Sequence, residues 1–297
     1  MIYDIIIIGA GPAGLTAGIY ALRDNKKIKV FEKETIGGHI TSSPLVSNYP
    51  GFIDKSGMEI ADSLYNQFVN LGGEVELESV VKIENKKPFE VIGEYETYQA
   101  KSVIIATGTT YRMLNLPKEE EFIGNGISFC VTCDGAFYKD KDVAVIGGGN
   151  SAIIEAIELS KLCHKVYMIV KRDILNGEDI NIKNVNELKN IEIIYNAEVK
   201  ELIGDTELEA IKLNNGNILK IDGIFEAIGQ IPNINIVDNI NKDQYGFVES
   251  NEDCTTNIPG IFVAGDVKSK KIRQLTTATS DGTIAALNAI KFLEKNL

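Results

Sequence analysis

The chain has 297 residues, of which 44% are hydrophobic and 24% are charged, a composition typical of a folded globular protein rather than a disordered one. This length exceeds what one hydrophobic core usually needs, so about two domains are expected. The formal net charge is −12. Such a charge argues against binding to nucleic acid or to an anionic membrane surface, because both require clustered cations.

The N-terminal sequence MIYDIIIIGAG carries no basic leader, and its apolar run is too short for a signal peptide. No apolar run approaches the ~20 residues that a membrane-spanning helix needs. We therefore expect a cytoplasmic protein without a membrane partner. In a reducing compartment, closely spaced cysteines are more typical of catalysis or metal binding than of a structural disulfide.

The first motif is a strand, a glycine-rich turn and a helix near the N-terminus. The apolar run from Tyr3 to Ile8 predicts a parallel strand that is buried on both faces. The next residues fit G-x-G-x-x-G, a pattern that allows a tight turn and close approach of a pyrophosphate: Gly9, Gly11, Pro12, Ala13 and Gly14. The following strand ends at Glu32, where a carboxylate can accept both hydroxyls of an adenosine ribose. The motif predicts a dinucleotide site; the alternative is only a tight strand–helix turn.

The same plan recurs in the middle of the chain. A strand at Val143–Ile146 precedes a second glycine loop and a helix that extends to about Leu162. The residues of this loop are Gly147, Gly148, Gly149, Asn150, Ser151 and Ala152. Two dinucleotide-binding domains in one chain suggest that electrons pass between two bound cofactors.

The second copy differs from the first at the end of its next strand. The position that matches Glu32 is Val170, followed by Lys171 and Arg172. No acid meets a ribose 2′-hydroxyl there, whereas two cations can meet a 2′-phosphate. The alternative is that Lys171 and Arg172 are a solvated pair at the end of a strand.

The sequence FCVTCDGAF places Cys130 and Cys133 in one turn, directly before Asp134. In a redox dithiol, one thiolate attacks a partner disulfide and the second thiol resolves the mixed disulfide. Asp134 can shuttle the proton if partial burial raises its pKa. A flavin is the natural mediator between a nicotinamide and this pair.

A zinc site is the competing interpretation of the cysteine pair, and it needs about four ligands. The other candidate ligands do not complete such a set, because two are adjacent on a predicted helix and the others are isolated in sequence: Cys163, His164, Cys254 and His39. We therefore predict no metal site. Cys163 and Cys254 are expected to be ordinary buried or half-buried thiols.

Taken together, these motifs resemble the low-molecular-weight, bacterial or archaeal type of thioredoxin reductase, a class of FAD-dependent pyridine nucleotide-disulfide oxidoreductases. The matching segments appear in the family's order along nearly the whole chain: IIIGAGPAGLTAGIYALR, NYPGF, IATGTTYR, CVTCDGAF, VIGGGNSAIIEA, AIGQIPN and GIFVAGDVKSKKIRQLTTATSDGTIAALNA. The resemblance implies an α/β fold of two Rossmann-like, three-layer domains, with the second inserted into the first. The expected FAD-binding domain covers residues 1–112 and 237–297, and the expected NAD(P)H-binding domain covers 113–236.

The resemblance also implies the cofactor contacts. In the FAD domain they are Gly9, Gly11, Pro12, Ala13, Gly14, Glu32, Gly37, Gly38, His39, Asn48, Ala106, Thr107, Gly108, Gly265, Asp266, Arg273, Gln274 and Leu275. For the nicotinamide cofactor they are Gly147, Gly149, Asn150, Ser151, Ala152, Lys171 and Arg172. A C-terminal helix that starts between residues 277 and 282 would aim its positive end at the flavin.

The same resemblance implies how the site works. Cys133 would face the flavin, Cys130 would exchange with the protein substrate, and Asp134 would be the acid. The inserted domain would swing about two chain crossings near residues 110–116 and 232–240, which lie in the proline-containing segments TTYRMLNLPK and GQIPNINIVD. Members of the family are usually dimers, so a homodimer is expected.

Two departures from the family pattern concern the cofactors. The family's phosphate-binding motif His-Arg-Arg-x-x-x-Arg is reduced here to Val170, Lys171, Arg172 and then Asn176. The donor therefore stays open between NADPH, NADH and another carrier such as ferredoxin. His39 stands where the family often has Gln, and either side chain can form a hydrogen bond near the flavin.

We expect an enzyme that moves electrons from NAD(P)H through FAD and Cys130–Cys133 to a thioredoxin-like protein. A dithiol oxidase on the same scaffold is an alternative, because nothing in the sequence excludes transfer to oxygen. A flavin-containing redox sensor is a third interpretation, although a sensor has no need of a hydride donor.

Overall fold

The computed structural model describes residues 1–43 and 45–295, and the chain forms two compact units. The first unit comprises Met1–Thr110 and Ile231–Leu297, and the second comprises Tyr111–Gln230. We expected the second boundary after residue 236, but the chain returns to the first unit earlier. The reason is that Asn233 bonds within that unit: Thr110 Oγ1 donates to its Oδ1 at 3.0 Å, and its Nδ2 donates to Thr107 O at 3.2 Å.

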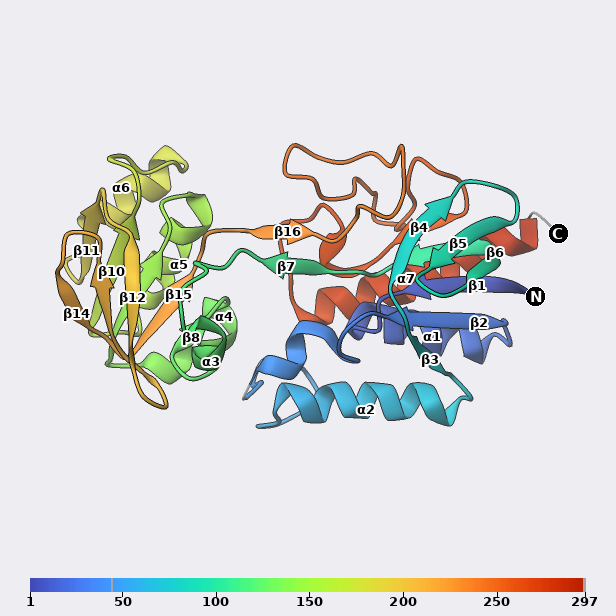
Figure 1. The fold of residues 1–297 in the computed structure, drawn as a ribbon, viewed down its shortest axis with the longest axis horizontal. Helices are drawn as coiled ribbons and strands as arrows, with labels where there is room; N and C mark the ends of the chain where they lie inside the picture. Colours follow the sequence, from blue (N-terminus) through green and yellow to red (C-terminus); the bar gives the residue numbers. More distant parts are fainter. Residues whose placement is uncertain (44, 296–297) are drawn as a thin grey trace. The chain divides into compact units, whose positions relative to one another are not determined.

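A seven-stranded sheet is the centre of the first unit, with the order β3-β2-β1-β6-β5-β4 and β17 paired to β6 (Figure 1). Strands β1, β2, β3, β6 and β17 pair in parallel, and β4 and β5 add an antiparallel edge. The strands are β1 (Ile2–Ile8), β2 (Ile28–Glu32), β3 (Val75–Leu77), β4 (Val80–Glu84), β5 (Phe89–Gly93), β6 (Thr97–Ile105) and β17 (Ile261–Val263).

Helices cover one face of this sheet. They are α1 (Pro12–Arg23), α2 (Gly57–Asn70) and α7 (Leu275–Lys295), with short 3-10 turns η1 (Gly38–Ser42) and η3 (Gly265–Val267). Ile5 and Ile7 of β1 pack with α1 and α7 in one apolar cluster, while Ile6 and Ile8 point into a second cluster on the other face. Burial on both faces explains the continuous apolar run that identified β1 in the sequence.

The second unit has three layers around a parallel sheet of order β11-β10-β9-β15-β8. These strands are β8 (Ile127–Ser128), β9 (Asp142–Ile146), β10 (Lys165–Val170), β11 (Ile191–Tyr195) and β15 (Gly223–Glu226). Helices α5 (Asn150–Ser160) and α6 (Asp179–Glu187) pack in the cluster on one face. An antiparallel sheet covers the other face, formed by β12 (Val199–Gly204), β13 (Leu208–Leu213) and β14 (Ile218–Lys220).

Short elements complete the second unit and connect it to the first. The short helices are α3 (Glu119–Phe122), α4 (Val131–Asp134) and the 3-10 turn η2 (Gly135–Tyr138). The two chain crossings are β7 (Thr109–Tyr111) and β16 (Gln230–Pro232), which pair with each other as a two-stranded sheet. In the part of the chain that the structure describes, no helix is both long and apolar enough to cross a membrane.

Helix α2 begins with a capping box. The backbone N–H of Glu59 donates to Ser56 Oγ at 3.2 Å, and the N–H of Ser56 donates to Glu59 Oε2 at 2.9 Å. Each bond satisfies an N–H group that has no partner inside the helix, so the box sets where α2 starts.

We expect Ser56→Ala to lower the free energy of unfolding by about 1 kcal/mol, because the cap hydroxyl is lost. Urea unfolding followed by circular dichroism measures this change. The control is Ser63→Ala, at an exposed position in the middle of the same helix. Equal stability of the two variants would contradict a role for the cap.

Candidate active site

Cys130 and Cys133 form a disulfide, with an S–S distance of 2.07 Å and a Cα–Cα distance of 5.3 Å. Cys130 precedes the first residue of α4, and the backbone N–H of Cys133 lies 3.2 Å from Cys130 Sγ. One turn of the chain thus holds both cysteines close enough to be joined. The two remaining cysteines, Cys163 and Cys254, are buried free thiols in different units, and burial raises the pKa of each to about 11.

Asp134 is connected to this disulfide through Ser128. The Ser128 hydroxyl donates to Asp134 Oδ2 at 2.6 Å, and the backbone N–H of Cys130 donates to Ser128 Oγ at 3.1 Å. Burial raises the pKa of Asp134, and the hydrogen bond from Ser128 opposes this shift. Asp134 Oδ1 is buried and has no hydrogen-bonding partner among the described residues. A carboxyl group in this setting can hold a proton beside the disulfide.

Two glycines of the first glycine loop stand where there is no space for a side chain. Gly9 has a φ of +104°, and a Cβ there would lie 2.3 Å from Ala106 O; a Cβ on Gly14 would lie 1.8 Å from Gly9 O. A Cβ on Gly11, in contrast, would meet nothing nearer than Gly37 O at 3.9 Å. Helix α1 starts at Pro12 with no side-chain cap, so the N–H groups of its first turn stay available to a phosphate.

Glu32 lies at the end of β2 and is oriented by three backbone N–H groups. Its Oε2 accepts from Ala10 at 2.8 Å, and its Oε1 accepts from Lys33 and Glu34 at 2.9 Å each. Carboxylate oxygens have spare lone pairs, so Glu32 can still accept from ribose hydroxyls. Its position next to the glycine loop fits the adenosine end of a dinucleotide.

Other predicted contacts gather around the start of η3 and α7. Asp266 Oδ1 is buried and forms no hydrogen bond with any described residue, although the Lys270 ammonium lies 3.4 Å away. Arg273 Nε donates to Asp266 O at 3.3 Å, and Asn48 Nδ2 donates to Gln274 Oε1 at 3.3 Å. An orphaned buried carboxylate oxygen is what a ribityl hydroxyl would satisfy. The hydroxyl of Thr109 is also buried and unsatisfied in the described part of the chain.

The remaining first-unit residues lie on neighbouring segments. Gly37 and Gly38 have φ angles of +106° and +63°, and Gly37 N donates to Ala10 O at 2.9 Å, which holds η1 and its His39 beside the glycine loop. Ala106, Thr107 and Gly108 follow the carboxyl end of β6, and Leu275 is the first residue of α7. The first unit thus brings its predicted contacts to the carboxyl edge of the sheet, where ligands of α/β folds bind.

The second glycine loop repeats the same constraints. Gly147 has a φ of +144°, and a Cβ there would lie 2.7 Å from Ala227 O; a Cβ on Gly148 would lie 2.6 Å from Val170 Cγ1. Nothing lies within 4 Å of a Cβ on Gly149, which is the N-cap of α5. Asn150, Ser151 and Ala152 form the first turn of α5. This loop therefore also leaves open backbone at a helix N-terminus.

The two predicted phosphate-binding cations, Lys171 and Arg172, differ in their ion pairs. Lys171 forms an ion pair with Glu198 at 3.0 Å, although 78% of its side chain is exposed. Glu198 in turn accepts from Lys200 at 2.8 Å. No ion pair of Arg172 occurs among the described residues.

Sequence reasoning did not identify three polar residues of the second unit: Ser128, Glu198 and Glu226. Glu226 ends β15, and both of its carboxyl oxygens are buried without a hydrogen-bonding partner in residues 1–43 and 45–295. Burial, together with the nearby Glu119, raises the pKa of Glu226 to about 9. The only sequence signal was an acid within the otherwise apolar stretch IFEAIG.

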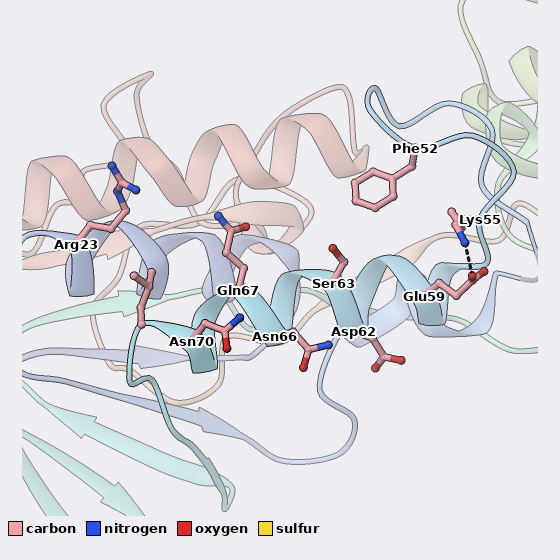
Figure 2. Close-up of a pocket in the computed structure, with 10 residues that line it drawn as sticks. Arg23, Phe52, Lys55, Glu59, Asp62, Ser63, Asn66, Gln67 and Asn70 are labelled. Atoms are coloured by element: carbon pink, nitrogen blue, oxygen red, sulfur yellow. Dashed lines mark hydrogen bonds and ion pairs between the residues drawn. The ribbon is translucent and has the colours of Figure 1, made fainter.

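A groove of about 800 Å³ runs along α2 in the first unit (Figure 2). Its lining includes Arg23, Phe52, Asp62, Asn66 and Gln67. The lining residues do not include any of the predicted site residues, and they carry both signs of charge. The groove is therefore separate from the cofactor contacts described above.

The site combines two glycine loops at sheet edges with a cysteine pair that forms a disulfide. This combination is typical of oxidoreductases that couple dinucleotides to disulfides. Residues 3–282 match the pyridine nucleotide-disulphide oxidoreductase family, and the chain belongs to this family. The family predicted from the sequence is thus confirmed.

The relatives match almost the whole length of the chain. The chain is 41% identical over 300 residues to a 34.2 kDa protein in the rubredoxin operon of Clostridium pasteurianum, which covers 98% of this chain and 97% of the relative. It is 36% identical to the thioredoxin reductase of Listeria monocytogenes, over 99% of this chain and 95% of the relative. The crystal structure of thioredoxin reductase from Streptococcus pyogenes superposes with a TM-score of 0.94 at 36% identity, over 99% of each chain. The predicted α/β fold with two Rossmann-like domains is confirmed by this likeness.

We expect Ser128→Ala to raise the pKa of Asp134 further, because the variant removes a hydrogen bond that favours the carboxylate. A pH titration of the Asp134 carboxyl carbon by NMR measures this shift. Ser160→Ala is the control, since that hydroxyl bonds to the backbone of its own helix. An unchanged or lower pKa in Ser128→Ala would contradict the described hydrogen bond.

Glu226 should make stability fall as pH rises. Its folded-state pKa of about 9 lies above the ordinary value, so its contribution is fully present below about pH 4.5 and is lost as pH rises through 9. In Glu226→Gln, we expect the decrease in the free energy of unfolding between pH 5 and pH 9 to be smaller by on the order of a few kcal/mol. Urea unfolding at several pH values tests this, with exposed Glu209→Gln as control. Parallel pH profiles of wild type and Glu226→Gln would disprove the shift.

Proposed function

We propose that the chain is a thioredoxin reductase that transfers electrons from NAD(P)H, through FAD and the Cys130–Cys133 disulfide, to a disulfide of a thioredoxin-like protein. The observation that carries this proposal is the closed Cys130–Cys133 disulfide beside the half-buried Asp134, whose pKa is raised by burial. The thioredoxin reductases of Listeria monocytogenes and Streptococcus pyogenes support it, because they match almost the whole chain.

FAD is the cofactor that fits the first unit. The phosphates would lie at the N-terminus of α1, over Gly11, where there is space for a ligand to approach the backbone. Glu32 would accept from the adenosine ribose. The unsatisfied oxygen of Asp266 would accept from the ribityl chain, with Arg273 and Gln274 nearby. The donor side, NADPH or NADH, would occupy the second loop at Gly149 and Asn150.

The chemistry of the disulfide step follows from the residues beside it. When bound, the flavin supplies the electron pair of a nicotinamide to the disulfide. Two electrons break the bond between Cys130 Sγ and Cys133 Sγ and leave two sulfur anions, so a proton must be delivered to stabilise the open form. Asp134 can deliver it because burial keeps its proton bound at higher pH than usual.

Ser128 has a positioning role in this step. Its hydroxyl bonds both to Asp134 and to the N–H of Cys130, so it holds the acid beside the turn that carries the disulfide. The Cys130 thiolate would then attack the disulfide of the partner protein, and Cys133 would resolve the mixed disulfide. The net result is one reduced partner and a restored Cys130–Cys133 bond.

The family resemblance adds three further features to the proposal. We propose a homodimer that works in the reducing environment of the cytoplasm, with a thioredoxin-like protein as its partner. The net charge of −12 fits neither nucleic acid nor an anionic membrane surface as a partner.

In Cys133→Ser, we expect reduction of thioredoxin to be lost by at least about 1,000-fold, because the disulfide cannot form. FAD binding and flavin reduction by NAD(P)H should persist. The assay is thioredoxin-dependent reduction of a disulfide dye, together with the flavin absorbance spectrum. Cys163→Ala is the matched control, since Cys163 is a free thiol in the same unit. Thioredoxin reduction that survives in Cys133→Ser would refute the assignment.

Stopped-flow mixing separates this function from a dithiol oxidase or a redox sensor. NAD(P)H should bleach the flavin within one turnover in the reductase. An oxidase would leave the flavin oxidised under NAD(P)H and would consume oxygen with a small dithiol. A sensor would show no steady turnover of the dye with thioredoxin present.

A further inference from the structure

We propose that Glu198 is a specificity-determining residue of the second nucleotide site and that it makes the chain favour NADH over NADPH. This inference rests on the proposed function, since it concerns the donor of that reaction. It starts from the ion pair of Glu198 with Lys171, one of the two cations that follow β10.

The end of β10 lies directly against the second glycine loop. Val170 is the last residue of β10, and its Cγ1 is 2.6 Å from where a Cβ on Gly148 would be. In folds of this type, the residue at that strand end and the residues after it meet the adenosine ribose. Lys171 and Arg172 therefore lie beside the position that the 2′-substituent of the ribose would occupy.

Backbone hydrogen bonds bring Glu198, from a distant part of the chain, to the position of the ribose 2′-substituent. Ala197 N donates to Val170 O at 3.0 Å, and Asn196 N donates to Arg172 O at 3.1 Å. These two bonds lay the segment before β12 alongside the residues that follow β10. The carboxylate of Glu198 consequently lies 3.0 Å from Lys171 Nζ and 2.8 Å from Lys200 Nζ.

Glu198 is an anion at neutral pH. The hydrogen bonds from Lys200 and Lys171 lower the pKa of its carboxyl group below the ordinary value. Its side chain is 33% exposed, so a ligand can reach it. A carboxylate at this position can accept a hydrogen bond from a ribose 2′-hydroxyl. Glu32 is placed to do the same in the first unit.

The same residues would bind a 2′-phosphate less favourably than a 2′-hydroxyl. It would have to displace Glu198 from Lys171, because one ammonium cannot fully pair with both anions. The position of the last motif arginine holds the neutral Asn176, whose N–H donates to Gly148 O at 2.8 Å. Directly after it, α6 starts with the N-cap Glu178 and with Asp179, both acidic. Of the motif cations, only Arg172 then remains without a described ion pair.

Binding of two adenosine fragments to the FAD-loaded protein tests the proposal without requiring turnover. The probes are 5′-AMP, whose ribose carries a free 2′-hydroxyl, and 2′,5′-ADP, whose ribose carries a 2′-phosphate. Isothermal titration gives the affinity ratio for wild type, for Glu198→Gln and for the control Glu201→Gln. Glu201 lies three residues after Glu198, within β12, and forms an exposed ion pair with Lys212 at 3.3 Å.

We expect wild type to bind 5′-AMP at least as tightly as 2′,5′-ADP. Glu198→Gln should shift the ratio toward 2′,5′-ADP by about threefold or more, within the range of a partly exposed ion pair, and Glu201→Gln should leave it unchanged. The ratio of kcat/KM for NADPH and NADH should move in the same direction.

Two results would overturn the inference alone: an unchanged ratio in Glu198→Gln, or a tenfold preference of wild type for 2′,5′-ADP. If neither fragment binds and NADH does not bleach the flavin, the inference and the pyridine nucleotide donor of the proposed function both fail. If the ratio shifts as expected but thioredoxin is not reduced, the inference holds and the proposed acceptor is wrong.

Discussion

The close approach of backbone to backbone at the carboxyl end of β1 is the constraint on which the first unit depends. A side chain on Gly9 or Gly14 would overlap carbonyl oxygens of the neighbouring segments, so strand, turn and helix pack together only because both positions lack a Cβ. This packing points the open N-terminus of α1 at the sheet edge where Glu32 and Asp266 also lie. The second unit meets the same constraint at Gly147, and each half of the molecule thereby gains a place for a phosphate.

The two units then diverge in the charge that surrounds those places. In the first, the carboxylate of Glu32 is held by backbone N–H groups, and no ion pair of Glu32 occurs within residues 1–43 and 45–295. In the second, the strand ends in the apolar Val170, and the carboxylate of Glu198, from another segment, pairs with Lys171 and Lys200. One folding plan thus supports the two proposed nucleotide sites, which differ in their electrostatic character.

Much of this arrangement could be predicted from local sequence. The glycine loops, the buried strands and the Cys130–Cys133 pair depend on neighbours within a few residues, and their patterns appear directly in the chain. The contacts that were missed join residues that are far apart or unremarkable in type. Glu198 meets Lys171 only because β10 and the segment before β12 run side by side, and a lone Ser128 has no pattern that marks it as a partner of Asp134. The end of the inserted unit was placed too late for the same reason, since the bonds of Asn233 to Thr107 and Thr110 are long-range.

The pairing of β7 with β16 has an evolutionary consequence. Because the outgoing and returning chains are hydrogen-bonded neighbours, the first unit presents its two open ends about 5 Å apart, the spacing of adjacent strands. A short turn could bridge such a gap and leave the seven-stranded sheet intact. The inserted unit could therefore be gained, lost or exchanged at this point in evolution without a change in the sheet of the first unit.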